Sequence, residues 1–164
     1  MRSLFALRIG MTERTLIGEY DLAVVEAAIK EAAATLGEEL VEIKIYKEYG
    51  EFAFEALLWK KEGVSLDDCE RAHGVISDLL DRYDDMFLSP YNLKISSMGL
   101  DRPIVTDDDY RRSLGVEIEC RVGKQKHVGV LQAFDCDKVI LLSDGKTCEL
   151  KRNILTKVQP YIRF

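Results

Sequence analysis

Histidine, tryptophan and proline are scarce in this sequence, which has two His, one Trp and three Pro among 164 residues. Two imidazoles leave little material for a zinc centre, which needs about four clustered ligands. No apolar run approaches the roughly 20 residues that a membrane helix requires. The apolar stretch near the N-terminus is too short for a signal peptide, and Arg8 interrupts it. These absences predict a cytoplasmic protein.

Cysteine is also thinly spread, since Cys69, Cys120, Cys136 and Cys148 occur singly and form no CxxC pair. Thiols of a cytosolic protein stay reduced, and an unpaired cysteine packs as a small apolar residue. We therefore expect buried structural thiols. The sequence also has no Walker loop, no GxGxxG and no GxSxG motif. It thus predicts no enzyme, no cofactor and no metal site.

Acidic residues, in contrast, are plentiful and come in runs at positions 67–68, 84–85 and 107–109. Such runs raise the question of a magnesium site or of acid–base chemistry. Each run lies at a predicted helix start or just past a helix end, where aspartate is common because it hydrogen-bonds free backbone N–H groups. Adjacent carboxylates alone also lack the convergent geometry that magnesium needs. We interpret the runs as structural.

The charge differs between the two halves of the chain. Residues 1–100 contain 11 Lys/Arg and 19 Asp/Glu, whereas residues 101–164 contain 12 and 10. The net charges are therefore −8 and +2, which together give the −6 of the whole chain. An acidic half suits basic proteins, and a mildly basic half suits phosphates. Ordinary solvated surface is the alternative interpretation.

The first part of the chain predicts a helix followed by a hairpin. Apolar residues recur at helical spacing from about Thr12 to Leu36, and Gly37 is a suitable helix stop. Two segments of alternating apolar and polar residues follow, at positions 41–46 and 52–59. Gly50 lies between them, which indicates two strands joined by a tight turn.

A second helix begins at Ser65, whose hydroxyl can accept a free backbone N–H while Asp68 completes a capping box. Its apolar stripe continues to Leu80. A third alternating strand occupies residues 91–97. The predicted order is α-β-β-α-β, with two helices on one face of a three-stranded sheet.

The last sixty residues predict a short helix and about five short strands. Thr106 precedes three aspartates, and Arg111 with Arg112 closes the helix, so both charge signs suit the helix dipole. Alternating segments follow, with a hairpin signal at positions 144–145 and a last strand at 154–158. A helix and five short strands in so few residues predict a small closed β-barrel, and the whole chain is therefore of the α+β class.

The segment YNLKISSMGLDRP, residues 91–103, separates the two halves. Its strand runs into a Ser-Ser-Met-Gly turn, and Pro103 disfavours a helical conformation at Arg102. We therefore place an N-terminal α/β domain at residues 13–98, an interdomain joint at 99–105 and a C-terminal barrel domain at 106–164.

The chain resembles the bacterial ribosome maturation factor RimP family in three segments: GVSLDDCERAHGVISDLLD at 63–81, SSMGLDRP at 96–103 and YRRSLG at 110–115. They occur in the family's order and spacing, and the resemblance runs from about residue 16 to the C-terminus. Met98 departs from the proline that is usual in the joint. The resemblance implies an Sm-like, SH3-type barrel and a non-catalytic factor that assists maturation of the small (30S) ribosomal subunit.

The resemblance also implies the partners: a small-subunit precursor, the ribosomal protein of the decoding region (the twelfth of the small subunit) and possible contact with 16S rRNA, all bound by a monomer. We expect the partner-binding residues in the joint and among the cations of the second half. They are Ser96, Ser97, Gly99, Leu100, Asp101, Arg102, Pro103, Arg111, Arg112, Lys124, Lys126, Lys151 and Arg152. The alternative is an Sm-type RNA-binding or self-assembling module without a ribosomal role.

Overall fold

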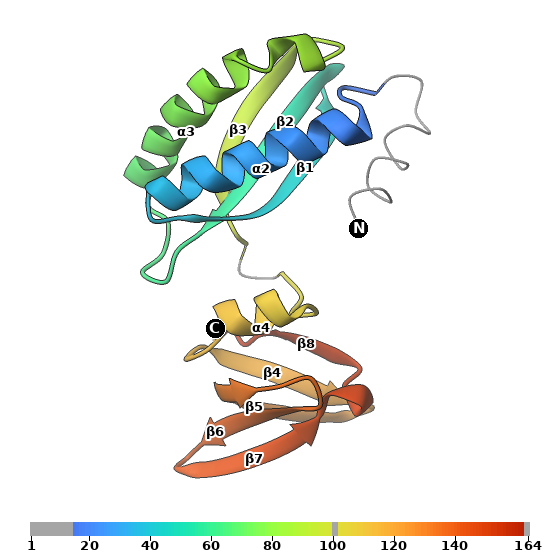
Figure 1. Ribbon diagram of the computed structural model, residues 1–164. Coiled ribbons are helices and arrows are strands. Elements are labelled where there is room, and N and C mark those ends of the chain that lie inside the picture. Colours follow the sequence, from blue (N-terminus) through green and yellow to red (C-terminus); the bar gives the residue numbers. More distant parts are fainter. Residues whose placement is uncertain (1–14, 100–101, 163–164) are drawn as a thin grey trace. The chain divides into compact units, whose positions relative to one another are not determined.

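The computed structural model of the protein describes residues 15–99 and 102–162 (Figure 1). The backbone falls into two compact units, the first ending at Met98 and the second beginning at Gly99. Each unit has its own apolar core. None of the helices in the two described ranges is long and apolar enough to cross a membrane.

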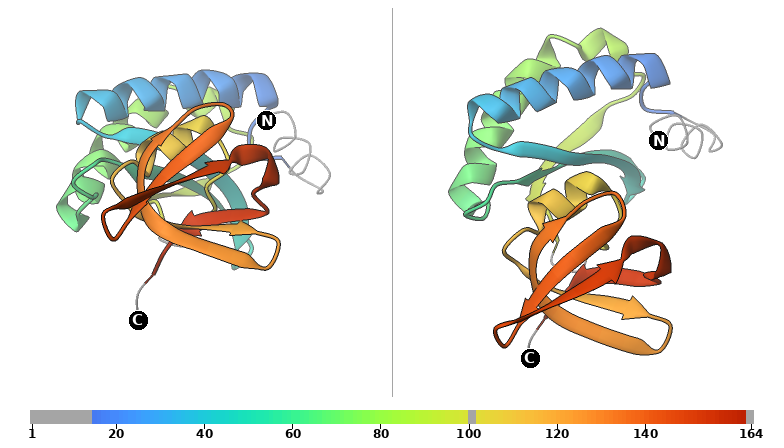
Figure 2. Two further views of the ribbon diagram at one scale, coloured as in Figure 1. Left: turned by 90° about the horizontal axis from the view of Figure 1, so that it is seen from below. Right: turned by 60° about the horizontal axis from the view of Figure 1, so that its bottom comes forward.

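The first unit is a three-stranded sheet with two helices on one face (Figures 1 and 2). Its elements are α2 (Glu19–Thr35), β1 (Glu39–Glu48), β2 (Glu51–Trp59), α3 (Leu66–Asp81), the 3-10 helix η1 (Asp84–Met86) and β3 (Tyr91–Ser97). β1 and β2 form an antiparallel hairpin, and β3 runs parallel to β2 at the opposite edge from β1. The predicted order α-β-β-α-β is confirmed.

Local signals in the sequence place the ends of these elements. Ser65 Oγ accepts the Asp68 N–H at 3.1 Å and Asp68 Oδ2 accepts the Ser65 N–H at 2.9 Å, so the predicted capping box is confirmed. The hairpin turns at Tyr49 and Gly50, which both have positive φ (54° and 82°). Glycine at the second position adopts a positive φ without steric strain, because it has no Cβ atom.

The helix α2 begins at Glu19, later than the apolar spacing predicts, and the part of the prediction before residue 15 lies outside the described residues. The difference arises because the preceding residues are held in bridge contacts. Leu16 C=O accepts the Leu88 N–H at 2.7 Å, and Ile17 forms an antiparallel bridge with Phe87. Leu16 and Ile17 are buried and belong to the core. They are apolar because they pack in this core from a segment that is not helical.

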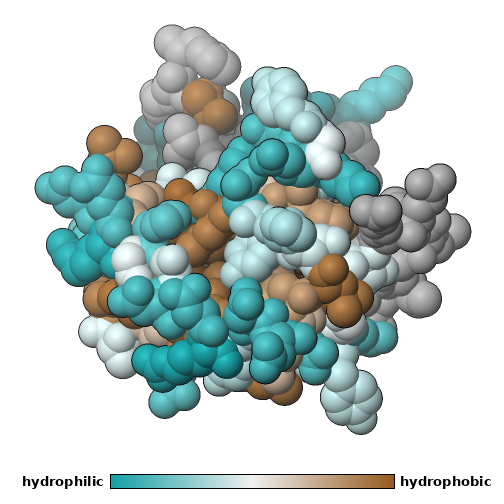
Figure 3. Space-filling view, turned by 90° about the horizontal axis from the view of Figure 1, so that it is seen from above, coloured by the Kyte–Doolittle hydropathy of each residue, from teal (hydrophilic) through white to brown (hydrophobic). Residues whose placement is uncertain are grey.

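The core of the first unit is built on alternating positions of β2. Phe52, Phe54, Ala56 and Leu58 all belong to it, as period-two alternation requires for one face of a sheet. Figure 3 shows the helix side of this unit, where polar side chains surround apolar patches. The exposed apolar side chains of the two helices are Tyr20, Val24, Leu66 and Val75.

Asp68 gives the first unit a pH dependence. Hydrogen bonds from the Ser65 backbone and then from Lys60, whose Nζ lies 3.0 Å from Asp68 Oδ2, lower the pKa of Asp68 to about 2. This value lies below the roughly 3.9 of an unfolded chain. The stabilisation is therefore complete above about pH 4 and is lost as the pH falls toward 2.

We expect the urea midpoint, followed by the fluorescence of the single Trp59, to fall between pH 4 and pH 2. The Asp68→Asn variant, which has no titrating group at this position, is expected to be less stable at neutral pH and to show a smaller fall. Identical falls in the two proteins would show that Asp68 does not contribute.

The second unit is a five-stranded antiparallel sheet preceded by a short helix (Figure 1). Its elements are α4 (Asp107–Arg112), β4 (Glu117–Val122), β5 (Gln125–Phe134), β6 (Lys138–Ser143), β7 (Lys146–Lys151), the 3-10 helix η2 (Arg152–Ile154) and β8 (Lys157–Pro160). The Thr106 hydroxyl accepts the Asp109 N–H at 3.1 Å, so the second predicted cap is also confirmed.

The predicted closed barrel is wrong, because the sheet does not close. Its strand order is β7-β6-β5-β4-β8, and no ladder joins β7 to β8 among the described residues. The predicted strand at 154–158 is also displaced, since η2 ends at Ile154 and β8 begins at Lys157. The chain leaves β7 through the 3-10 turn of η2, in which Leu155 donates its N–H to Arg152 C=O at 3.2 Å, and the four-residue strand β8 follows.

Candidate binding surfaces

The joint begins at the end of β3 in the first unit. The Ser96 hydroxyl donates to Glu55 on the neighbouring strand β2, and Met98 donates its N–H to Leu58 C=O at 3.1 Å. Ser97 and Gly99 are exposed. Ser96 is therefore held within the sheet, while the chain leaves the unit at Gly99. Leu100 and Asp101, which the sequence also proposes as contacts, lie outside the described residues.

On the other side, the joint enters the second unit through Arg102 and Pro103. Ile104, buried in the core, donates its N–H to Val158 C=O at 2.9 Å. Pro103 is exposed, and the Arg102 side chain is partly exposed with its Nε 3.7 Å from Asp109 Oδ1. Arg102 thus lies at the surface end of an ion pair whose acid is buried.

Asp109 organises the start of α4. Its Oδ2 accepts the N–H groups of Val105 and Thr106, both at 3.0 Å, and its Oδ1 accepts an N–H of Arg112 at 2.9 Å. Burial by itself would raise the pKa of Asp109, but the backbone donors Thr106 and Val105 and the Arg112 guanidinium together lower it. The Arg112 side chain is only 4% exposed. In this fold Arg112 is an internal partner of Asp109.

The two remaining cations near α4 also have acidic partners. Arg111 lies 3.4 Å from Asp108 Oδ1 in an exposed pair. Arg152 donates to Asp107 Oδ1 at 2.7 Å, and its guanidinium lies 4.4 Å from the centre of the Tyr110 ring. The hydrogen bond to Asp107 raises the pKa of Arg152. Arg111 and Arg152 therefore present less uncompensated charge than their sequence positions indicate.

Three of the lysines expected to bind partners, Lys124, Lys126 and Lys151, lie at two ends of the second unit. Lys124 and Lys126 flank the start of β5, and Lys151 pairs with Lys138 of β6 beside the far end of β5. The side chains of Lys124, Lys126 and Lys151 are exposed, and that of Lys138 is partly buried. Lys124 and Lys126 therefore lie near the start of β5 and Lys151 lies near its end, with the length of this ten-residue strand between them.

A row of cations instead crosses three neighbouring strands. Arg121 of β4 is in register with Lys126 of β5 on one side and with Lys157 of β8 on the other. Cross-strand partners project to the same face of a sheet, and these three residues are exposed while the adjacent Cys120 is buried. Lys124 in the β4–β5 turn extends the row. We call Arg121, Lys124, Lys126 and Lys157 the basic row.

Glu119 compensates part of the basic row. Its Oε2 accepts Arg121 Nε–H at 2.9 Å, and Lys126 Nζ lies 3.7 Å from its Oε1. The Arg121 hydrogen bond is the main reason that the pKa of Glu119 is lowered. Lys124 and Lys157 have no ion-pair partner within residues 15–99 and 102–162. The row therefore keeps a net positive charge, and an ordered set of exposed cations suits the phosphates of a nucleic acid backbone.

The same face carries a hollow beside the basic row, lined by both apolar side chains and the acidic residues Glu117 and Asp144. It has a volume of about 440 Å³ and is lined in part by Val128, Val130 and Tyr161. Lys126 Nζ lies 5.6 Å from the centre of the Tyr161 ring. An aromatic ring next to a row of cations is a combination that single-stranded nucleic acid binders use. Two further aromatic residues of this unit, Tyr110 and Phe134, do not offer a free ring, since Tyr110 is buried and stacks on the partly buried Phe134 at 5.6 Å.

Among the described residues, one group has three side chains of the metal-binding type within reach of one another: Asp135, Cys136 and Asp137, all exposed. Asp135 Oδ1 accepts the N–H groups of Asp137 and Lys138, at 2.8 and 2.9 Å, which gives it a role in the β5–β6 turn. The exposure of Cys136 corrects the prediction that the thiols are buried. Cys120 fits the prediction, and its burial raises its pKa to about 11.

Two members of the basic row, Arg121 and Lys157, are absent from the residues expected to bind partners, and the sequence does contain a signal for Arg121. The signal is the turn at Gly123 and Lys124. Residues at equal distances before and after this turn are paired in the hairpin, so Arg121 lies opposite Lys126. The pairing with Lys157 has no such local signal, since β8 reaches β4 from some thirty residues further along the chain.

These observations describe a small protein of two compact units, the second of which carries a row of exposed cations. Comparison with known protein families identifies the first unit. Residues 28–101 match the family model described as the RimP N-terminal domain, which covers most of the first unit. The first unit therefore contains a RimP N-terminal domain, and this match supports placing the chain in the RimP family, a family of ribosome maturation factors that act without catalysis.

Proposed function

We propose that this protein assists maturation of the small (30S) ribosomal subunit by binding a pre-subunit ribonucleoprotein. The observation that carries the proposal is the match of residues 28–101 to the RimP N-terminal domain. By the same membership, we infer that it acts in the cytoplasm as a monomer. Its partners would be the subunit precursor, the ribosomal protein of the decoding region and 16S rRNA.

The charges of the two units support a division of labour. Residues 15–99 contain 8 Lys/Arg and 18 Asp/Glu, so the described part of the first unit suits a basic protein partner. The basic row of the second unit suits rRNA phosphates, and each phosphate contact adds a salt-sensitive contribution to affinity. We further propose that the joint contacts the same particle, and that the second unit is an opened relative of the Sm-like, SH3-type fold.

The proposed mechanism needs no bond to be made or broken. A factor that binds two arrangements of an assembling particle with different affinities shifts the population toward the one it prefers. Simultaneous contact by two linked units makes such a preference sensitive to geometry, because both sites must be reachable at once. Misfolded arrangements that present only one of the two surfaces would then be bound more weakly.

Sedimentation of the protein with purified ribosomal particles tests the proposal. We expect it to migrate with free small subunits and not with complete ribosomes, because a maturation factor prefers an incomplete particle. The large subunit, which has a similar phosphate backbone, is the control for non-specific charge. Equal migration with all three particles, or with none, would contradict the proposal.

The alternative function is an Sm-type RNA-binding or self-assembling module without a ribosomal role. It is favoured by the edges of β7 and β8, which have no further strand neighbour within residues 15–99 and 102–162, since open sheet edges allow strand pairing between copies. The solution mass distinguishes the two functions. A monomer at micromolar concentration supports the ribosomal proposal, whereas a ring of defined copy number supports the alternative.

A further inference from the structure

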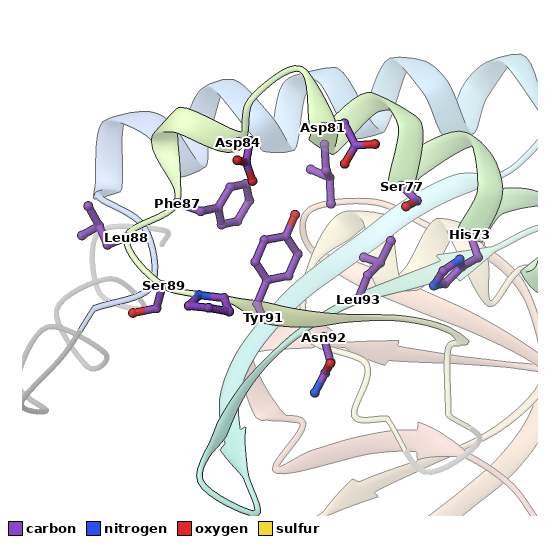
Figure 4. A pocket seen from close by; sticks show the side chains of 12 residues that line it. His73, Ser77, Asp81, Asp84, Phe87, Leu88, Ser89, Tyr91, Asn92 and Leu93 are labelled. Atoms are coloured by element: carbon purple, nitrogen blue, oxygen red, sulfur yellow. The ribbon is translucent and has the colours of Figure 1, made fainter.

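A groove of about 800 Å³ lies in the first unit between the second half of α3 and the strand β3 (Figure 4). Ser77 and Asp81 of α3 form one wall, and Tyr91 and Leu93 of β3 form the other. Asp84 of η1 lies at the end of the helix wall. The groove is contained within the first unit, so its shape depends on a single core.

The strand β3 leaves one side of its backbone unpaired along this groove. In the part of the chain that the structure describes, β3 pairs with β2 and with no other strand, because the sheet order is β1-β2-β3. An unprotected sheet edge is a template for another strand. Lys94 would be the natural protection of this edge, but its Nζ lies 2.6 Å from Glu48 Oε2 of β1, across the sheet. Edge strand β3 is therefore open to an incoming backbone.

The side chains that line the groove are negatively charged overall. Asp81 and Asp84 are both exposed, and no lysine or arginine is among the lining residues. Neither aspartate has an ion-pair partner within residues 15–99 and 102–162. The Tyr91 hydroxyl points up between β3 and α3 toward the two carboxylates (Figure 4). Burial, and then the charges of Asp84 and Asp81, raise the pKa of Tyr91.

We propose that this groove binds an extended polypeptide segment rich in lysine or arginine, which adds to the sheet as a fourth strand beside β3. Main-chain hydrogen bonds to the strand edge would supply affinity, and alternate side chains would supply specificity. Basic side chains on the helix-facing side of the segment would reach Asp81 and Asp84 and lie beside Tyr91 and Leu93, which project to that same face. The proposal goes beyond the ribosomal function and does not depend on it.

Other occupants fit the groove less well. The two carboxylates repel a nucleic acid backbone. A second copy of this chain, paired edge to edge through β3, would bring its own Asp81 and Asp84 close to the first pair. Its β3 segment, YNLKISS, offers the single cation Lys94, which already has a partner in Glu48. A basic segment from another protein meets neither difficulty.

A designed peptide tests the proposal on the full chain. The probe is a labelled Lys-Val-Lys-Val-Lys-Val-Lys peptide with blocked ends, followed by fluorescence anisotropy. Its seven residues match the seven of β3. We expect saturable binding that weakens with salt. A peptide with glutamate in place of each lysine is expected not to bind, and one with every backbone nitrogen N-methylated is expected to bind at least tenfold more weakly, because it has no backbone N–H to donate to the strand edge.

Variants of the protein locate the site. The double variant Asp81→Asn/Asp84→Asn is expected to weaken peptide binding about tenfold at low salt, and Ser77→Lys is expected to weaken it further by placing a cation in the groove. The control is Glu31→Gln/Glu62→Gln, which removes two exposed charges elsewhere in the unit and is expected to bind normally. Circular dichroism confirms that each variant is folded.

Three outcomes would overturn the proposal. The first is no binding of the lysine peptide by the folded native protein. The second is equal weakening by the groove variants and the control, which would show attraction to net charge alone. The third is undiminished binding of the N-methylated peptide, which would exclude strand addition. A dimer that Ser77→Lys dissociates would assign the groove to a second copy instead.

Discussion

Replacement of Asp109 with alanine is expected to unfold the second unit, because it removes the acid from a buried ion pair with Arg112. Arg112 is 4% exposed and its guanidinium donates to Asp109 at 2.9 Å. Removing one member of a buried ion pair typically costs about 3–5 kcal/mol. The same change removes the side-chain acceptor of two backbone N–H groups, those of Val105 and Thr106.

A loss of this size is large for a unit of this length. The described part of the second unit, residues 102–162, has a core of nine buried apolar residues. A domain of fewer than about 70–80 residues rarely has more than about 3–5 kcal/mol from its core. The expected loss is therefore comparable to the whole stability of the unit, and partial unfolding at room temperature is the expected result.

The single tryptophan makes the effect measurable unit by unit. Trp59 lies in β2 and reports on the first unit, whereas amide hydrogen exchange of β4 and β5 reports on the second. We expect Asp109→Ala to abolish exchange protection in the second unit with little change in the Trp59 transition. Asp109→Asn keeps an acceptor and is expected to lose less. A second change, Arg112→Met, is expected to restore part of the protection.

A fully protected second unit in Asp109→Ala would contradict the assignment of Asp109 as the organising acid. The single variant Arg112→Met is the matched control, since it removes the cation and leaves Asp109 with its backbone donors. The coupling between the two positions follows from the double-mutant cycle, because the residues are in direct contact.

Local sequence signals were sufficient to predict where several helices and strands begin or end. Ser65 and Thr106 start helices as predicted, because a capping box involves residues only three apart in sequence. The strand Tyr91–Ser97 is found with the predicted bounds. The wrong predictions concern contacts between segments that are far apart in the sequence. The closed barrel failed because closure depends on how β7 and β8 meet, and alternation within each strand carries no information on its neighbour.

The arrangement of the cations on the second unit was also not predictable from local sequence signals. Arg112 and Arg111 are adjacent in the sequence, yet one is buried against Asp109 and the other is exposed. Lys126 and Lys151 were grouped by charge alone, and strand register places them at opposite ends of β5. Which cations share a face is decided by pairing between distant strands. The sequence therefore predicts the sign of the charge on a unit better than its arrangement.

Removal of three lysines from the basic row is expected to reduce binding to small ribosomal subunits by about a hundredfold at low salt. The variant is Lys124→Gln/Lys126→Gln/Lys157→Gln, which leaves Arg121 in place to pair with the buried Glu119. Each lost phosphate contact lowers the slope of log affinity against log salt by about 0.7–0.9. Three lost contacts therefore predict a slope that is smaller by about two.

The control is Lys61→Gln/Lys146→Gln/Lys151→Gln, which removes the same charge from exposed positions outside the row. It includes Lys151, which charge alone had placed in the same patch. Affinity measured by sedimentation over a series of salt concentrations separates the two interpretations. If the row binds phosphate, the first variant loses both affinity and slope while the control keeps them. If the control loses as much, the attraction comes from net charge, and the register of Arg121 with Lys126 and Lys157 has no role in binding.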